Sequence, residues 1–298
     1  MPSLWKFGKL STVELGKRTF KKFGEDELVT RSAALSYYFI LALFPMFLFL
    51  MSLIGLFAGP NSEMRQGILN ALSQMAPGST SSLIQSVLTE TTKASSGVKV
   101  AAGILGALWA ASAGISALVV SLNVVHKVTE TRPWWKQKLI AIALTVALAA
   151  LVIAALVLVL YGGKIGQMIA SQFGLGDLFT DVWRVAQWIF PFIAMFLSFS
   201  VVYYFAPNIK GGWHWVTPGA ALGVVLWLVA SLGFRAYLHF FNSYSATYGS
   251  LGAVVILLLW LFITGFAILI GAELNWIIEA ADRGEVAPAD TQVPRRAA

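Results

Sequence analysis

The chain has 298 residues, of which 58% are apolar and 12% are charged, with a net charge of +7 and a mean hydropathy of +0.75. Soluble domains contain about 45–50% apolar and about 25% charged residues, so this composition excludes a soluble globular protein and indicates an integral membrane protein. The sequence has no cysteine, which excludes disulfides, cysteine-ligated metals and thiol catalysis.

The first 31 residues form a basic arm with seven Lys or Arg residues and no apolar run of signal-peptide length, so we expect this cytoplasmic arm to be retained. Ser11 and Glu14 have the spacing of a capping box, which predicts the start of a helix. Apolar and basic residues then alternate around the helix, which predicts an interfacial amphipathic helix. Attraction to anionic lipid explains its charge better than nucleic-acid binding does.

Six charge-free apolar runs follow, and each is long enough to cross about 30 Å of hydrocarbon as a helix. We place the spanning helices at Ala33–Ala58, Val100–Leu122, Leu139–Leu160, Ala186–Phe205, Trp215–Leu238 and Leu251–Ile277. The predicted fold is therefore an all-α integral membrane protein, with a six-transmembrane-helix bundle over residues 32–280.

Lysines and arginines predict the orientation of this bundle, because basic loops stay in the cytoplasm. Fifteen of them lie on the side that holds both termini and five on the other, which predicts that both termini are cytoplasmic. The outer segment 59–98 has helical periodicity around a Pro77-Gly78 break, which predicts two short amphipathic helices. These helices rest on the bundle or the interface, or alternatively form a lid. Residues 281–298 are expected to be a flexible cytoplasmic tail.

The fifth span carries a close-packing motif, because Gly219 and Gly223 lie four residues apart. Small residues at this spacing let two helices approach closely. We expect this surface to make a contact within the bundle, with a homo-oligomer contact as the less common alternative.

Polar side chains at membrane depth are costly and are often functional. We predict a polar cluster on the cytoplasmic side from residues that end apolar runs at the same surface: Arg31, Asn123, His126, Glu273 and Asn275. Within this cluster we expect an ion pair between Arg31 and Glu273. The pair would be either a structural pin that neutralises two charges or an inner gate or substrate contact.

A second polar group surrounds the turn between the last two spans. Its members are Arg235, Tyr237, His239, Asn242, Tyr244 and Tyr248. Aromatic belts anchor helices at membrane interfaces, which is one interpretation. The other is an outer-side entrance for an amphiphile with an anionic head.

No catalytic or metal-binding pattern is visible in the sequence. The three histidines lie in different regions, no two of them have ligand spacing, and phosphate-binding loops and nucleophile elbows are absent. We therefore expect no enzymatic activity, no metal site and no cofactor.

Several motifs also carry a family resemblance. They are Arg31-Ser-Ala-Ala-Leu-Ser-Tyr-Tyr-Phe39 with Phe44-Pro45, Pro207-Asn208, Val216-Thr-Pro218-Gly219-Ala220, Tyr248-Gly-Ser-Leu-Gly252 and Gly271-Ala-Glu273-Leu-Asn275. In this order, over roughly residues 15–280, they resemble the YihY/virulence factor BrkB family of bacterial inner-membrane proteins. The resemblance implies a role in moving lipid-like molecules. It brings no catalytic residues, because the family's older ribonuclease label is a misassignment. Trp276 is bulkier than the residue expected after the last motif.

Two function classes follow from the residues and the resemblance together. The first is a bacterial inner-membrane protein that transports or flips a lipid-like or amphiphilic envelope component. The alternative is a non-transporting membrane scaffold or envelope-assembly partner. The expected partners are membrane lipids and an amphiphilic anionic substrate, without nucleic acid.

Overall fold

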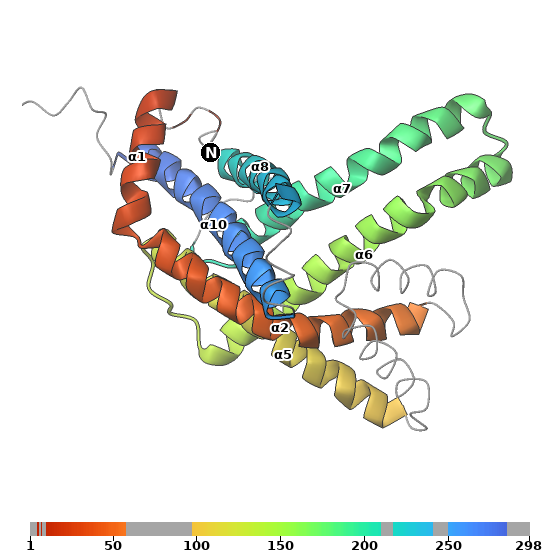
Figure 1. Cartoon of the computed structure of the whole chain (residues 1–298), viewed down its shortest axis with the longest axis horizontal. Coiled ribbons are helices and arrows are strands. Elements are labelled where there is room, and N and C mark those ends of the chain that lie inside the picture. The colour runs from red at the N-terminus through yellow and green to blue at the C-terminus, as the bar shows by residue number, and fades with distance from the viewer. Residues whose placement is uncertain are drawn as a thin grey trace, which may run out of the picture. The chain divides into compact units, whose positions relative to one another are not determined.

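The computed structural model describes residues 5, 7, 10–57, 97–209, 217–240 and 250–284. Within these residues the chain forms seven α-helices and no strand, as predicted for an all-α protein (Figure 1). The helices are α1 (Thr12–Glu25), α2 (Leu28–Phe57), α5 (Gly97–Val125), α6 (Trp134–Phe173), α7 (Asp177–Phe205), α8 (Pro218–Phe240) and α10 (Ser250–Asp282).

Six of these helices are long and apolar enough to cross a membrane, and α1 is not among them. Each predicted span coincides with one of the six, so the six-span prediction is confirmed. Two helices run well beyond the predicted bounds: α6 continues to Phe173 and α7 begins at Asp177. The segment 59–98, except for the start of α5, and the tail after residue 284 lie outside the described residues.

The extra length of α6 and α7 comes from close packing between their extensions (Figure 1). Trp183 Nε1 donates a hydrogen bond to Gly162 O at 2.6 Å. A methyl group at Gly166 would overlap the Trp183 indole, so only glycine permits this approach. Gly174, at φ +62°, then ends α6 in the left-handed conformation that glycine adopts without strain. Lys164 therefore lies within α6, beyond the predicted end of the third span at Leu160.

The chain divides into two compact units. The first comprises Met1–Ile40, Ser116–Ile140 and Phe199–Ala298, and the second comprises Leu41–Ile115 and Ala141–Ser198. The first unit contains all five residues of the predicted cytoplasmic-side cluster. The candidate site therefore lies within that unit.

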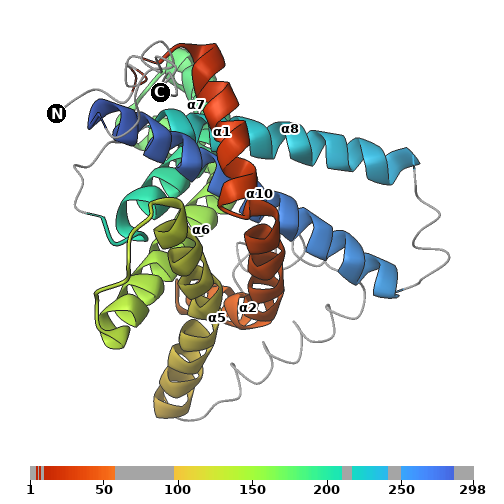
Figure 2. The same cartoon turned by 90° about the vertical axis from the view of Figure 1, so that its left-hand side faces the viewer.

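In the first unit α8 and α10 lie side by side (Figures 1 and 2). Their backbones come closest at Gly219 and Gly271, where a methyl group on either glycine would overlap the carbonyl oxygen of the other. Farther along, Trp227 Nε1 donates to Thr264 Oγ1 at 3.0 Å. Gly223 faces the end of α7, so both glycines of the predicted motif make contacts within the bundle.

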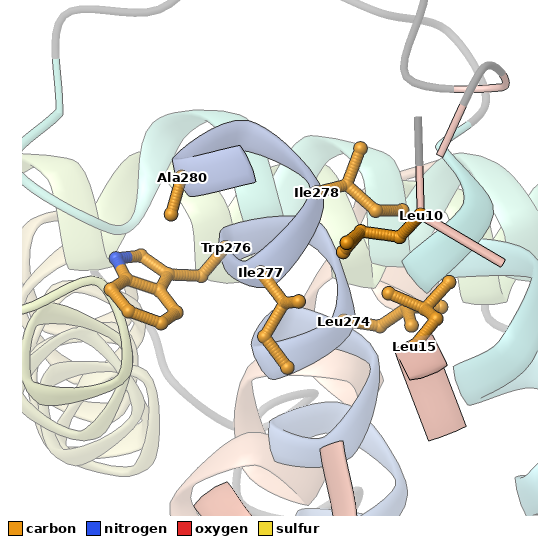
Figure 3. Packing of buried hydrophobic residues seen from close by; sticks show 7 residues of the cluster. All are labelled: Leu10, Leu15, Leu274, Trp276, Ile277, Ile278 and Ala280. Atoms are coloured by element: carbon orange, nitrogen blue, oxygen red, sulfur yellow. The ribbon is translucent and has the colours of Figure 1, made fainter. Parts of the chain in front are cut away.

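Helix α1 crosses the C-terminal half of α10 (Figure 2). Ser11 caps its N-terminus by accepting a hydrogen bond from Glu14 N at 3.2 Å, as the capping-box spacing predicted. Leu10 and Leu15 are buried against Leu274 and Ile278 of α10 (Figure 3). An apolar contact thus fixes α1 to the end of the last span, and its position at a membrane interface stays a prediction.

Candidate functional site

The five residues of the predicted cytoplasmic-side cluster do not share one hydrogen-bond network. Asn123, His126, Glu273 and Asn275 are buried, and Arg31 is half-buried. Arg31, Asn123 and Asn275 have hydrogen-bond partners of their own, whereas the Glu273 carboxyl group and His126 Nε2 have none among the described residues.

Asn275 caps the N-terminus of a neighbouring helix. Its Oδ1 accepts a hydrogen bond from Gly219 N at 2.8 Å, and its Nδ2 donates to Thr217 Oγ1 at 2.9 Å. Thr217 Oγ1 also accepts from Ala220 N at 3.0 Å. The first amides of a helix have no partner within that helix, so Asn275 on α10 satisfies a buried amide of α8. Its role is structural.

Asn123 ties the loop after α5 to the end of α7. Its Nδ2 donates to Glu130 Oε2 at 2.8 Å, and its Oδ1 accepts from Asn208 N at 2.7 Å. Arg132 binds both oxygens of Glu130, at 2.8 and 2.7 Å, and donates to Ala206 O at 2.9 Å. The Arg132 hydrogen bonds lower the pKa of Glu130 to about 2, against the opposing effect of burial. This network is also structural.

The predicted ion pair between Arg31 and Glu273 is wrong. Arg31 Nε donates instead to the backbone oxygen of Asp26 at 3.0 Å. The reason is the turn that follows α1, in which Glu27 has a φ of 52°. This turn brings Arg31 of α2 close to the last carbonyl groups of α1. A cation is favoured there because the carbonyl end of a helix carries partial negative charge.

His126 follows α5 and is buried, and its Nε2 has no hydrogen-bond partner among the described residues. Burial, followed by the charge of Arg283, lowers its pKa to about 4. The imidazole is therefore neutral at neutral pH. It adds no charge to the residues around it.

Glu273 is the residue of the predicted cluster whose buried carboxyl group has no partner to account for it. Its side chain is 0% exposed within a spanning helix, and neither carboxylate oxygen has a hydrogen-bond partner among the described residues. The charged groups that act on it are Asp26 and Lys22 from α1 and Lys127 from the segment after α5. We call Lys22, Asp26, Lys127, Glu273 and Trp276 the charge cluster.

Asp26 resembles Glu273 in its surroundings. Its side chain is 13% exposed, and Oδ2 is buried without a hydrogen-bond partner in the described part of the chain. The nearest cation is Lys22, whose Nζ lies 4.0 Å from Oδ2 but only 2.6 Å from Glu25 Oε2. The ammonium is thus held mainly by Glu25.

Trp276 separates the two lysines of the charge cluster from the apolar contact with α1. It points to the other side of α10 from Leu274 and Ile278 (Figure 3). Lys127 Nζ lies 4.6 Å and Lys22 Nζ 5.4 Å from the centre of its ring. Cations are attracted to the face of an indole. The bulk of this residue, which the sequence left unexplained, therefore provides a platform for two cations.

Lys127 reaches this platform through an unusual backbone conformation. It has a φ of 54°, in the left-handed region that glycine usually occupies after a helix. Val128 N donates to Asn123 O at 2.9 Å, which closes the turn. The neighbouring Lys22 side chain, and then burial, lower the pKa of Lys127. A strained residue at such a place is typical of functional sites.

Lys22, Asp26 and Lys127 belong to the charge cluster although the sequence pattern did not predict them as site residues. One signal was present: Asp26 lies five residues before Arg31, close to the charge-free run that begins at residue 32, and a carboxylate near membrane depth needs a partner.

The outer-side entrance remains a prediction. Arg235 and Tyr237 lie on α8 and are exposed. His239 lies on the same helix, but its side chain is not described, and Asn242, Tyr244 and Tyr248 lie outside the described residues.

Residues 19–295 match the protein family described as Virulence factor BrkB. The chain belongs to the BrkB family. A BrkB-family relative in Bacillus subtilis, named putative ribonuclease-like protein YfkH, is 34% identical over 262 residues, which cover 88% of this chain and 94% of that protein. A UPF0761 membrane protein of Xanthomonas oryzae and another of Xanthomonas axonopodis are each 26% identical over 271 residues. The match covers 88% of this chain and 60% of each of those longer proteins. No solved structure matches.

The family resemblance predicted from the motifs is thus confirmed. Membership of the BrkB family, together with six candidate spans, identifies a polytopic membrane protein. The word ribonuclease comes from the name of the Bacillus subtilis relative, where it is qualified as putative and describes that protein.

Proposed function

We propose that this BrkB-family protein moves an amphiphilic, lipid-like envelope component across the bacterial cytoplasmic membrane. The observation that carries the proposal is Glu273, a fully buried carboxyl group in a spanning helix without a hydrogen-bond donor among the described residues. Burying such a group costs several kcal/mol. A glutamine would avoid most of that cost, so a purely structural helix gains nothing from the carboxyl group.

The surroundings of Glu273 suit a substrate with an anionic head. Lys22 and Lys127 bring two ammonium groups to the Trp276 ring. An anionic head can accept hydrogen bonds from ammonium groups. Phe20 is 79% exposed, which offers an apolar surface on the helix that also carries Lys22. Membrane lipids are therefore the proposed partners.

Reconstitution into vesicles of phosphatidylethanolamine and phosphatidylglycerol tests this function. A fluorescent phospholipid in the inner leaflet becomes accessible to an impermeant quencher only when it is flipped. We expect the wild-type protein to accelerate this exposure and Glu273→Gln or Lys127→Gln to abolish most of the acceleration.

The matched control is Glu279→Gln, on the same helix. Its carboxylate is 31% exposed and lies 3.7 Å from Arg283, so the change alters charge on α10 without touching the charge cluster. It should keep the wild-type rate. Wild-type vesicles that expose the lipid no faster than protein-free vesicles refute the proposal.

One observation favours the alternative of a membrane scaffold. Gly219 and Gly271 hold α8 and α10 in backbone contact, and Asn275 bonds the two helices together. Such a pair suits a fixed framework as well as a carrier. A wild-type protein that does not flip lipid would favour the scaffold.

The proposed orientation places both termini in the cytoplasm, on the basis of the lysine and arginine distribution. The absence of cysteine permits a direct test, because Ser82→Cys and Thr291→Cys each create a single thiol. In intact spheroplasts an impermeant thiol reagent should label position 82 and leave position 291 unlabelled. Labelling of position 291 contradicts this orientation.

A further inference from the structure

The two carboxyl groups of the charge cluster face each other. The Asp26 side chain lies within hydrogen-bonding range of Glu273. Both oxygens of Glu273 and Oδ2 of Asp26 are buried, and none of the three has a donor among the described residues. Ionised carboxylates only accept hydrogen bonds, so two of them can bond to each other only if one holds a proton.

The neighbouring cations are held by other partners. Lys22 on α1 bonds to Glu25 at 2.6 Å, and Arg31 at the start of α2 donates to a backbone oxygen. Lys127, after α5, lies over the Trp276 ring. Lys22 Nζ lies 4.0 Å from Asp26 Oδ2, and in the described part of the chain none of these three cations forms an ion pair with Glu273.

We propose that Asp26 and Glu273 form a proton-binding site, the carboxyl pair, in which the two side chains share one proton. A second part of this proposal rests on the function proposed above: the carboxyl pair also couples lipid movement to the proton gradient. When the proton leaves, two negative charges face each other in a buried place and repel. Asp26 ends α1, next to the turn at Glu27, so the repulsion pushes the end of α1 away from α10.

The proton-binding site is tested on purified protein in detergent, independently of transport. Dicyclohexylcarbodiimide modifies protonated carboxyl groups in apolar surroundings, and mass spectrometry identifies the modified residue. At neutral pH we expect modification of Glu273 or Asp26 and little modification of Glu279, the carboxyl group paired with Arg283 on the same helix. Modification should decline as the pH rises.

Asp26→Asn tests the sharing of the proton. With a neutral amide beside it, Glu273 ionises more easily, so its modification should decline at lower pH than in the wild type. An unchanged pH profile, or modification of Glu273 no greater than that of Glu279 at every pH, overturns the proposal. If Asp26→Asn fails to fold, the infrared C=O stretching band of a protonated carboxyl group provides the test. This band should be present in the wild type and missing in Glu273→Gln. Its absence from the wild type overturns the proposal.

Coupling is tested in the same vesicles with and without an imposed pH gradient. We expect the gradient to change the rate of lipid exposure in the wild type and to have no effect in Glu273→Gln. A wild-type rate that ignores the gradient refutes coupling while the function stands. No lipid exposure at all refutes the function and the coupling together, and the carbodiimide result still decides whether the proton site exists.

Discussion

The contact between Gly219 and Gly271 makes a sharp prediction about stability. In Gly271→Ala the new methyl group would overlap the carbonyl oxygen of Gly219 and the hydroxyl of Tyr203. The first is backbone and cannot rotate away. The second would have to leave its hydrogen bond to Ile268 O, which is 2.7 Å long. Both α8 and the end of α7 must therefore shift.

The magnitude follows from three effects. Overpacking of this kind costs about 1–3 kcal/mol. Loss of the Tyr203 hydrogen bond costs about 1 kcal/mol more. Alanine is favoured over glycine within a helix by about 1 kcal/mol, which offsets that second cost. We therefore expect Gly271→Ala to lower the free energy of unfolding by about 1–3 kcal/mol.

Gly233→Ala is the matched control, because it lies on α8 and has no atom within 4 Å of the new methyl group. The same substitution should there be neutral or stabilise the protein, by up to about 1 kcal/mol. Thermal unfolding in detergent, followed by circular dichroism, compares the two. If Gly271→Ala and Gly233→Ala shift the midpoint in the same direction, the close approach of α8 and α10 is refuted.

Three further changes have expected outcomes in the same unfolding assay. Asn275→Ala should lower the free energy of unfolding by about 1–2 kcal/mol, as for a lost helix cap. Asn275→Asp keeps the acceptor for Gly219 N and should lower it less, so equal losses in the two variants would contradict the cap. The folded-state pKa of Glu130, about 2, lies below its ordinary 4.5, so its pairing with Arg132 stabilises the fold above pH 4.5 and this stabilisation is lost as the pH falls towards 2. Glu130→Gln should flatten that acid dependence, and an unchanged pH profile would count against the pair. Trp276→Leu should cost about 1–2 kcal/mol through two lost cation–π contacts, and Trp276→Phe should cost less.

The spans could be predicted from the sequence because hydrocarbon accepts only long apolar helices. That signal ends where the membrane ends, so it could not find the extensions of α6 and α7. These extensions depend on Gly162 and Gly166 fitting the side chain of Trp183, a contact between segments about 20 residues apart in the chain. Hydropathy contains no information on such a contact.

For the candidate site, the sequence could predict only the depth of its residues in the membrane. Asn123, Glu273 and Asn275 lie at the ends of apolar runs, and all three are buried in the structure. Which of them meet depends on two turns, at Glu27 and Lys127, where non-glycine residues adopt positive φ. Such conformations are rare outside glycine, so the sequence favoured an Arg31–Glu273 pair that these turns prevent.

The arrangement around Glu273 determines which helix responds to its protonation. Asn275, two residues farther along α10, is bonded to the start of α8, and Gly271, two residues before, touches the same helix. Helix α10 is thus fixed on both sides of Glu273. Helix α1 contacts α10 near both of its own ends, through Leu10 and Leu15 at one end and through Phe23, whose ring centre lies 5.4 Å from that of Phe266, at the other. In the proposed proton step the repulsion therefore acts on the end of α1 that also carries Lys22, whose ammonium lies 5.4 Å from the centre of the Trp276 ring, so the same step acts on a cation that is available to a lipid head group.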